Sequence, residues 1–139
     1  MEPCVKLESS AFVADRELIE ALEKHSSQIV CDEDRLLFNQ GDDPSGLYIL
    51  HHGDATLTMR SPNGDLALCM TTSGDSLLGL PALVGHEPYS LSAKARKGSD
   101  LSFVSREDFD ELMQTMPSLP LKILHVLAAE VRAARQALL

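Results

Sequence analysis

Residues 37–53, LFNQGDDPSGLYILHHG, decide how the chain folds. Two short apolar runs, 36–38 and 47–50, flank the turn-forming residues 39–46, and Gly53 ends the second run. Glycine, proline, asparagine and aspartate that gather between two apolar runs indicate a tight connection between two strands. We therefore expect short strands here, with a turn at each end of the second one.

The same alternation of strands and turns extends toward the C-terminus. Apolar residues alternate with polar ones at Ala55, Leu57 and Met59, at Leu66, Leu68 and Met70, at Leu91, Ala93 and Ala95, and at Leu101 and Phe103. Such alternation is typical of half-buried strands. Between the first two of these runs, residues 61–65 form a predicted turn, in which Asn63-Gly64 is a strong hairpin signal. Short strands at this spacing predict an antiparallel sandwich or barrel over about residues 29–104.

Helical periodicity flanks the predicted strands on both sides. Asp15 precedes one amphipathic segment, and Ser105 precedes another with acidic residues in its first turn. Pro117 ends this second helix, and a last helix follows to the end of the chain without an interior glycine. We thus expect one N-terminal helix and C-terminal helices over 105–139.

The last helix carries an apolar stripe with spacings of three and four residues. Its members are Leu124, Leu127, Val131, Ala134 and Leu138. A stripe of this period suits the seam of a helix–helix dimer. It also suits packing on the chain's own barrel, for which Leu121, Ile123 and Ala128 offer additional apolar surface. We expect a homodimer through the stripe and keep the intramolecular alternative open.

Length and composition fit a single globular domain over residues 1–139. The chain is 44% hydrophobic, which supplies enough apolar surface for a core. With 12 Lys and Arg against 21 Asp and Glu, its formal net charge is -9, which disfavours direct binding to nucleic acid. No apolar stretch approaches the ~20 residues of a membrane span, and the N-terminal residues lack a signal-peptide pattern. We expect a cytoplasmic protein without membrane contact.

The cysteines do not indicate a cross-linked or metal-binding scaffold. Cys4, Cys31 and Cys69 are widely spaced and form no CxxC pair. Small disulfide-stabilised domains and structural zinc sites need more cysteines at shorter spacings. We predict that all three are reduced thiols.

The sequence contains no pattern that predicts catalysis. The adjacent His51 and His52 are expected at a strand end, where neighbouring side chains point to opposite faces and cannot share one metal ion. A barrel-type metal enzyme that uses these histidines with Glu87 and Asp42 is an alternative, but two histidines one residue apart are missing. We predict no catalytic residue and no metal ligand, and therefore no enzyme.

Together these residues resemble a cyclic-nucleotide-binding domain. The family phrase "LF..GD", a short loop and "LYIL..G" is matched within residues 37–53, and Gly64 and Gly74-Asp75 continue it. Residues 79–84, GLPALV, look like the phosphate-binding cassette, and residues 89–95 look like the strand that follows it. Within this superfamily, the layout resembles the effector half of the catabolite activator / fumarate-nitrate regulator (Crp/Fnr) family of bacterial transcription factors.

The resemblance implies an α+β, mainly β fold. This fold is an antiparallel β-roll (a double-stranded β-helix or jelly roll) with an N-terminal helix and a long C-terminal helix. In the Crp/Fnr family the long helix forms a parallel dimer, and a DNA-binding helix-turn-helix domain follows it. Since the sequence stops at Leu139, where that domain would begin, we expect a stand-alone module that needs a partner regulatory protein to reach a promoter.

The resemblance also implies a site for a cyclic nucleotide, the one ligand or cofactor that the sequence suggests. The candidate binding residues are Gly79, Leu80, Pro81, Ala82, Leu83, Tyr89 and Ser90. In the family, a glutamate binds the ribose and an arginine neutralises the phosphate, and the matching positions here are Leu80 and Tyr89. Leucine accepts no hydrogen bond and a phenol is neutral at pH 7. We expect a degenerate cassette with weak or lost binding of cAMP and cGMP.

Three functions stay open on the sequence alone. The first is a cyclic-nucleotide-binding module with an altered cassette. The second is a sensor that keeps the roll but houses another small ligand, and the third is a ligand-free dimerisation or protein-interaction domain. In a sensor, a ligand that touches both the roll and the long helix would shift the helix pair between two packings. The sequence therefore predicts a regulatory module.

Overall fold

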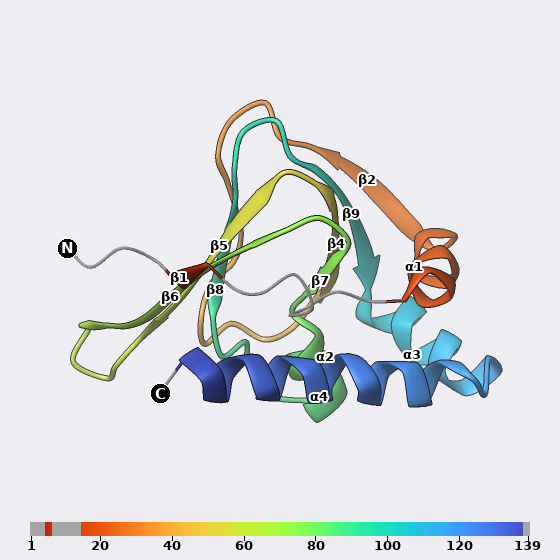
Figure 1. Ribbon diagram of the computed structural model, residues 1–139. Coiled ribbons are helices and arrows are strands. Elements are labelled where there is room, and N and C mark those ends of the chain that lie inside the picture. Colours follow the sequence, from red (N-terminus) through yellow and green to blue (C-terminus); the bar gives the residue numbers. More distant parts are fainter. Residues whose placement is uncertain (1–4, 7–14, 138–139) are drawn as a thin grey trace.

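The computed structural model describes residues 5–6 and 15–137. Their elements are, in chain order, β1 (Val5–Lys6), α1 (Arg16–Glu23), β2 (Ser26–Val30), β3 (Arg35–Phe38), β4 (Gly46–His52), β5 (Asp54–Arg60), β6 (Leu66–Ser73), β7 (Ser76–Leu78), α2 (Leu80–Gly85), β8 (Ser92–Ala95), β9 (Asp100–Ser105), α3 (Arg106–Thr115) and α4 (Leu119–Ala137). In Figure 1 the long helix α4 runs along one side of the strands, and α1 and α3 gather near its N-terminal end.

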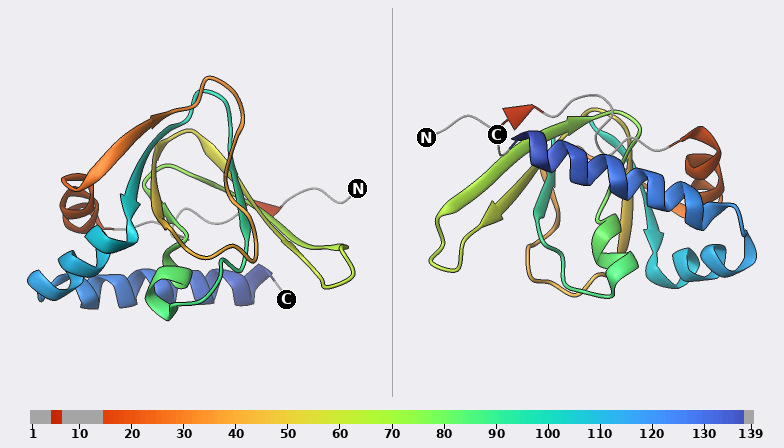
Figure 2. Two further views of the ribbon diagram at one scale, coloured as in Figure 1. Left: turned by 180° about the vertical axis from the view of Figure 1, so that it is seen from behind. Right: turned by 60° about the horizontal axis from the view of Figure 1, so that its bottom comes forward.

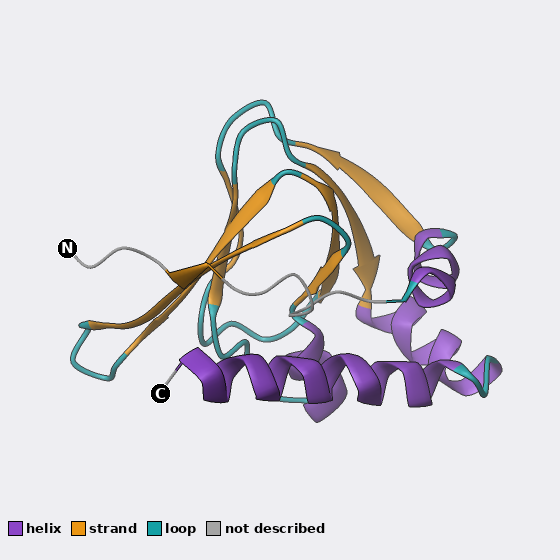
Figure 3. Cartoon of the chain, viewed as in Figure 1, coloured by secondary structure: helices purple, strands orange, loops and turns teal. Residues whose placement is uncertain are grey.

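The described strands form two sheets that curl into a roll (Figure 3). The strand order is β1-β6-β5-β8-β3 in one sheet and β2-β9-β4-β7 in the other. Every pairing among these strands is antiparallel except that of β1 with β6. The predicted antiparallel β-roll with an N-terminal helix and a long C-terminal helix is therefore confirmed.

Local sequence signals fix the ends of the elements where they were expected. Asp15 Oδ1 accepts a hydrogen bond from the Leu18 amide at 3.0 Å and caps α1, and Ser105 Oγ accepts one from the Asp108 amide at 3.2 Å and caps α3. Gly64 closes the hairpin between β5 and β6 at φ +90°, a conformation that glycine adopts without strain. The strands predicted over about residues 29–104 correspond to β2 through β9.

Two clusters of buried residues stabilise the fold. The one that we call the helical core lies where α1, α3 and α4 cover β4 and β9, as the two views of Figure 2 show. The other, the roll core, lies inside the roll and includes Leu50, Leu57 and Leu101. Helix α2 belongs to both, because Leu80 and Leu83 are in the helical core whereas Ala82 is in the roll core. This short helix therefore links the inside of the roll to the C-terminal helices.

Helix α4 has two apolar faces rather than one. One face packs on the protein itself through Leu119, Ile123, Val126 and Glu130, all of which are buried. Leu127 is half-buried beside them against the helical core. The other face is exposed and carries Leu121, Leu124, Ala128 and Val131 at spacings of three, four and three residues. We call these four residues the exposed stripe.

The predicted dimer stripe therefore falls on both faces. Leu124 and Val131 are 59% and 52% exposed, as a seam requires, but Leu127 turns toward its own roll. Leu121 is 60% exposed and Ala128 is exposed too, so neither belongs to the intramolecular side where we expected them, whereas Ile123 does. Leu138 and the side chain of Ala134 lie outside the described residues.

The prediction of three reduced thiols is wrong for Cys69. Cys69 is joined in a disulfide, whereas Cys31 is a free thiol buried in the roll core. Burial raises the pKa of the Cys31 thiol, which keeps it protonated and unreactive. The parallel pairing of Val5 with Met70 brings the N-terminal chain beside β6, a proximity that sequence spacing does not reveal.

Candidate ligand pocket

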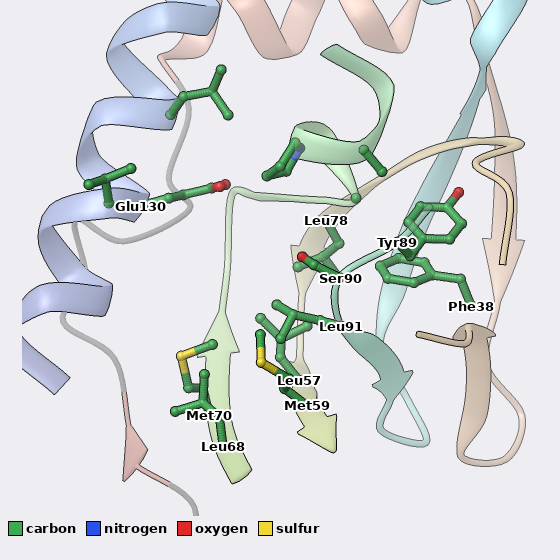
Figure 4. Close-up of a pocket in the computed structure, with 15 residues that line it drawn as sticks. Phe38, Leu57, Met59, Leu68, Met70, Leu78, Tyr89, Ser90, Leu91 and Glu130 are labelled. Carbon is green, nitrogen blue, oxygen red and sulfur yellow. The ribbon is translucent and has the colours of Figure 1, made fainter. Parts of the chain in front are cut away.

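A cavity of about 280 Å³ opens between the roll, α2 and α4 (Figure 4). Its wall is formed by Phe38, Leu57, Met59, Leu68, Met70, Leu78, Gly79, Pro81, Ala82, Tyr89, Ser90, Leu91, Leu127, Glu130 and Val131. Carbon and sulfur atoms dominate this wall, and no lysine, arginine or histidine is among the described residues that form it. The cavity therefore favours an apolar occupant and offers no positive side chain to an anion.

The turn into α2 forms the part of the wall where the cassette was expected. Gly79 adopts φ +92°, and α2 begins directly after it with Pro81 in its first turn. A Cβ atom at Gly79 would lie 3.0 Å from Tyr89 Cε1 and 3.4 Å from the Gly46 carbonyl oxygen. Only glycine combines this backbone conformation with so close an approach. Gly79 thus sets the course of the backbone into α2 beside Tyr89.

Tyr89 is fixed in the wall of the cavity. Its ring stacks on Phe38 with centroids 4.0 Å apart and planes 15° apart. Its hydroxyl donates to the Gly46 carbonyl oxygen at 2.6 Å and accepts from the Ser45 amide at 3.2 Å. The Tyr89 backbone also pairs with Gly41 and Asp42. The phenol hydroxyl is therefore occupied by the backbone at the start of β4 and is not available to a ligand phosphate.

The seven candidate cassette residues separate into two groups. Gly79, Pro81, Ala82, Tyr89 and Ser90 line the cavity. Leu80 and Leu83 are 0% and 1% exposed, do not line the cavity, and pack in the helical core. Leu80 thus stands at the position of the family's ribose-binding glutamate, but its side chain serves the core.

Glu130 is the polar residue of the cavity that the sequence analysis did not select. Its side chain extends from α4 into the cavity (Figure 4), and the residue is only 9% exposed. Its Oε1 atom has no hydrogen-bond partner among the described residues, and burial raises the pKa of the carboxyl to about 8. Glu130 follows Leu119, Ile123 and Val126 at spacings of four, three and four residues, so it lies on the same buried face of α4. This spacing is the signal in the sequence from which its burial could have been predicted.

Arginine side chains from elsewhere do not replace the missing positive charge. Arg96 is 75% exposed at its side chain and lies 3.8 Å from an Asp54 carboxylate oxygen. Arg132, on α4, is exposed and is not part of the cavity wall. The residues that surround the cavity thus supply one carboxyl group and no cation.

The polar residues of the alternative enzyme hypothesis do not form a metal site. His51 Nε2 lies 2.9 Å from Ser102 Oγ and 3.8 Å from Glu23 Oε1, while His52 is exposed. In the part of the chain that the structure describes, no three His, Cys, Asp or Glu side chains gather as metal ligands would.

Nor is any described helix both long and apolar enough to cross a membrane.

The structure is a β-roll in which the short helix α2 and the long helix α4 border one cavity, the arrangement of a small-ligand-binding type of domain. The family model of the cyclic nucleotide-binding domain matches residues 28–116, which is more than half of the chain. The protein therefore belongs to the cyclic nucleotide-binding domain family. No curated protein sequence matches the chain.

Solved structures with the same fold include bacterial regulators and a cyclic nucleotide-binding domain, and this likeness shows a shared fold. The catabolite activator protein of Thermus thermophilus superposes with a TM-score of 0.74 at 22% identity, over 89% of this chain and 58% of its own. A cyclic nucleotide-binding domain from Methylobacillus flagellatus gives 0.71 at 21% identity, over 88% and 69%. The sensor domain of the regulator DNR from Pseudomonas aeruginosa gives 0.66 at 20% identity, over 88% and 82%. The chain thus spans little more than half of the Thermus protein.

Proposed function

We propose that this chain is a regulatory sensor module whose pocket no longer favours cyclic nucleotides. The observation that carries the proposal is Tyr89, which stands where the family has its phosphate-binding arginine and whose hydroxyl is held by the Gly46 backbone. A desolvated phosphate needs a positive partner, and arginine supplies it through two parallel N–H donors. Loss of that partner forfeits ~2–5 kcal/mol, or about 30- to several thousand-fold in affinity.

Isothermal titration calorimetry with cAMP and cGMP tests this proposal directly. We expect no saturable heat at pH 7 up to about 1 mM nucleotide, which corresponds to a binding free energy of only ~4 kcal/mol. Weak binding could come from the missing cation or from the Glu130 carboxyl. A parallel titration of Glu130→Gln separates these two causes, because that variant removes the carboxyl without restoring a cation. It is expected to remain equally silent. Micromolar binding of either nucleotide to the unaltered protein would contradict the proposal.

The module is further proposed to act as a dimer through the exposed stripe of α4. Four apolar residues at heptad-like spacing on one exposed helix face suit a partner helix. The opposite face of the same helix lines the cavity through Leu127 and Glu130, and Val131 belongs to both. An occupant of the cavity would therefore contact the roll and the dimer helix at once, which is the differential contact that regulation requires.

A charge in the exposed stripe should separate the dimer. For Leu124→Glu we expect light scattering to give the 15.2 kDa mass of one chain, against twice that mass for the unaltered protein. Leu127→Glu is a poorer choice because Leu127 packs on the helical core. Val30→Glu is the matched control, since Val30 is 66% exposed at the end of β2, at the opposite side of the roll from α4 (Figure 1). An unchanged mass for Leu124→Glu would contradict dimerisation through this face.

A further inference from the structure

We propose that the cavity binds a small apolar molecule with a primary amine at one end, and that Glu130 receives the amine. This inference rests on the proposed function, because it assigns a ligand class to the same pocket. Three observations carry it: the size and apolar wall of the cavity, the direction of the Glu130 side chain, and the unpartnered Oε1 atom.

The size of the cavity favours a ligand smaller than a cyclic nucleotide. Ligand pockets commonly occupy about 300–1,000 Å³, and this cavity of about 280 Å³ lies just below that range. Met59 and Met70 lie on the adjacent strands β5 and β6, and Phe38 is another part of the wall (Figure 4). Sulfur atoms and ring faces suit an aromatic or aliphatic ligand. A polar sugar would leave its hydroxyls without partners on such a wall.

Glu130 sets the polar end of the ligand. The carboxyl is nine-tenths buried, and a buried acceptor without a donor is costly, so a ligand that brings a donor is favoured. Toward the ionised form of Glu130, an ammonium group offers both donors and a compensating charge, whereas a carboxylate or phosphate would place a second negative charge beside it. No other charged side chain among the described residues of the wall competes for the ligand.

The other titratable group in the wall does not interfere with this pairing. The Tyr89 hydroxyl donates to Gly46 and faces β4, on the far side of its own ring from Glu130 (Figure 4). Ser90 is the remaining polar side chain of the wall and is neutral. Glu130 is therefore the group that distinguishes ligands by charge.

Three probes of matched shape test the proposal on the full chain. They are 2-phenylethylamine, 2-phenylethanol and phenylacetate, which share a ring and a short chain but end in a cation, a neutral hydroxyl and an anion. Burial raises the pKa of Glu130 to about 8, so the calorimetry is done at pH 9, where this carboxyl is ionised and the amine is still a cation. We then expect the amine to bind about 10- to 100-fold more tightly than the alcohol, with no measurable binding of phenylacetate. In Glu130→Gln the preference for the amine should fall to within about threefold of the alcohol.

A control variant and a cyclic-nucleotide titration make the outcomes separable. Glu111→Gln removes an exposed carboxylate on α3 and should leave the preference for the amine unchanged. Three results would each overturn the inference. They are equal binding of the three probes, an unchanged preference for the amine in Glu130→Gln, and no binding of the amine up to about 10 mM, which corresponds to a binding free energy under ~3 kcal/mol. Binding of cAMP by the same sample would instead overturn the proposed function.

Discussion

Replacing Tyr89 with alanine is expected to lower the free energy of unfolding by about 3–5 kcal/mol. The residue is 4% exposed and its ring stacks on Phe38 in the roll core. Truncation therefore leaves a cavity, removes the stacking and leaves the Gly46 carbonyl and the Ser45 amide without their partner. Urea denaturation of Tyr89→Ala and the unaltered protein measures the difference.

Tyr89→Phe separates the hydroxyl from the ring. This variant keeps the stacking and removes only the hydroxyl. Its free energy of unfolding is therefore expected to lie about 1–3 kcal/mol below that of the unaltered protein. Tyr48→Phe is the matched control, because the half-buried Tyr48 hydroxyl makes one longer bond, to the Leu37 carbonyl oxygen at 3.2 Å. If Tyr89→Phe cost no more than Tyr48→Phe, the Tyr89 hydroxyl would not be an anchor of the β4 backbone.

Glu130→Gln is expected to stabilise the protein in a manner that grows with pH. Burial raises the pKa of this carboxyl from 4.5 to about 8, so between these values the folded state holds a proton that the unfolded state has lost. The free energy of unfolding of the unaltered protein is therefore not reduced by Glu130 below pH 4.5, and it falls as the pH rises toward 8. At one pKa unit per ~1.4 kcal/mol, the cost reaches at most about 5 kcal/mol at high pH.

Thermal melts at pH 5 and pH 9 measure this dependence. Glutamine resembles the protonated carboxyl and does not titrate, so the two proteins should melt within a few degrees of each other at pH 5. At pH 9 the variant should melt higher by about 10 °C. Glu111→Gln, on the exposed face of α3, is expected to show no such divergence. Parallel melting curves across this range would mean that Glu130 ionises freely in the folded protein.

The strands and turns follow from local chemistry that the sequence displays. The alternation in β5 and β6, the Asn63-Gly64 turn and the caps at Asp15 and Ser105 all act within a few residues along the chain. Backbone preferences of this kind hold wherever the segment lies, so periodicity and turn residues were enough to predict them. The family phrase then identified the roll, because its glycines mark corners where side chains do not fit.

The cassette could be located from the sequence but not interpreted side chain by side chain. Gly79 and Tyr89 were found by their match to the family phrase, and the replacement of arginine by a phenol was evident. That the Tyr89 hydroxyl is bound by Gly46, 43 residues earlier, depends on how β4 lies against the segment before β8. Likewise, the fully buried Leu80 is a core residue only because α2 sits between two packed clusters.

By itself, the sequence determined a β-roll between helices and a cassette without its arginine and glutamate. Tertiary structure alone decided that Glu130 enters the pocket, that Leu127 faces inward while Leu121 faces outward, and that Cys69 lies beside an N-terminal strand. The reason is physical: α4 is apolar around most of its circumference, so its own pattern does not say which face meets the roll. That choice is made mainly by α1 and α2, which are distant from α4 in sequence and pack with it in the helical core.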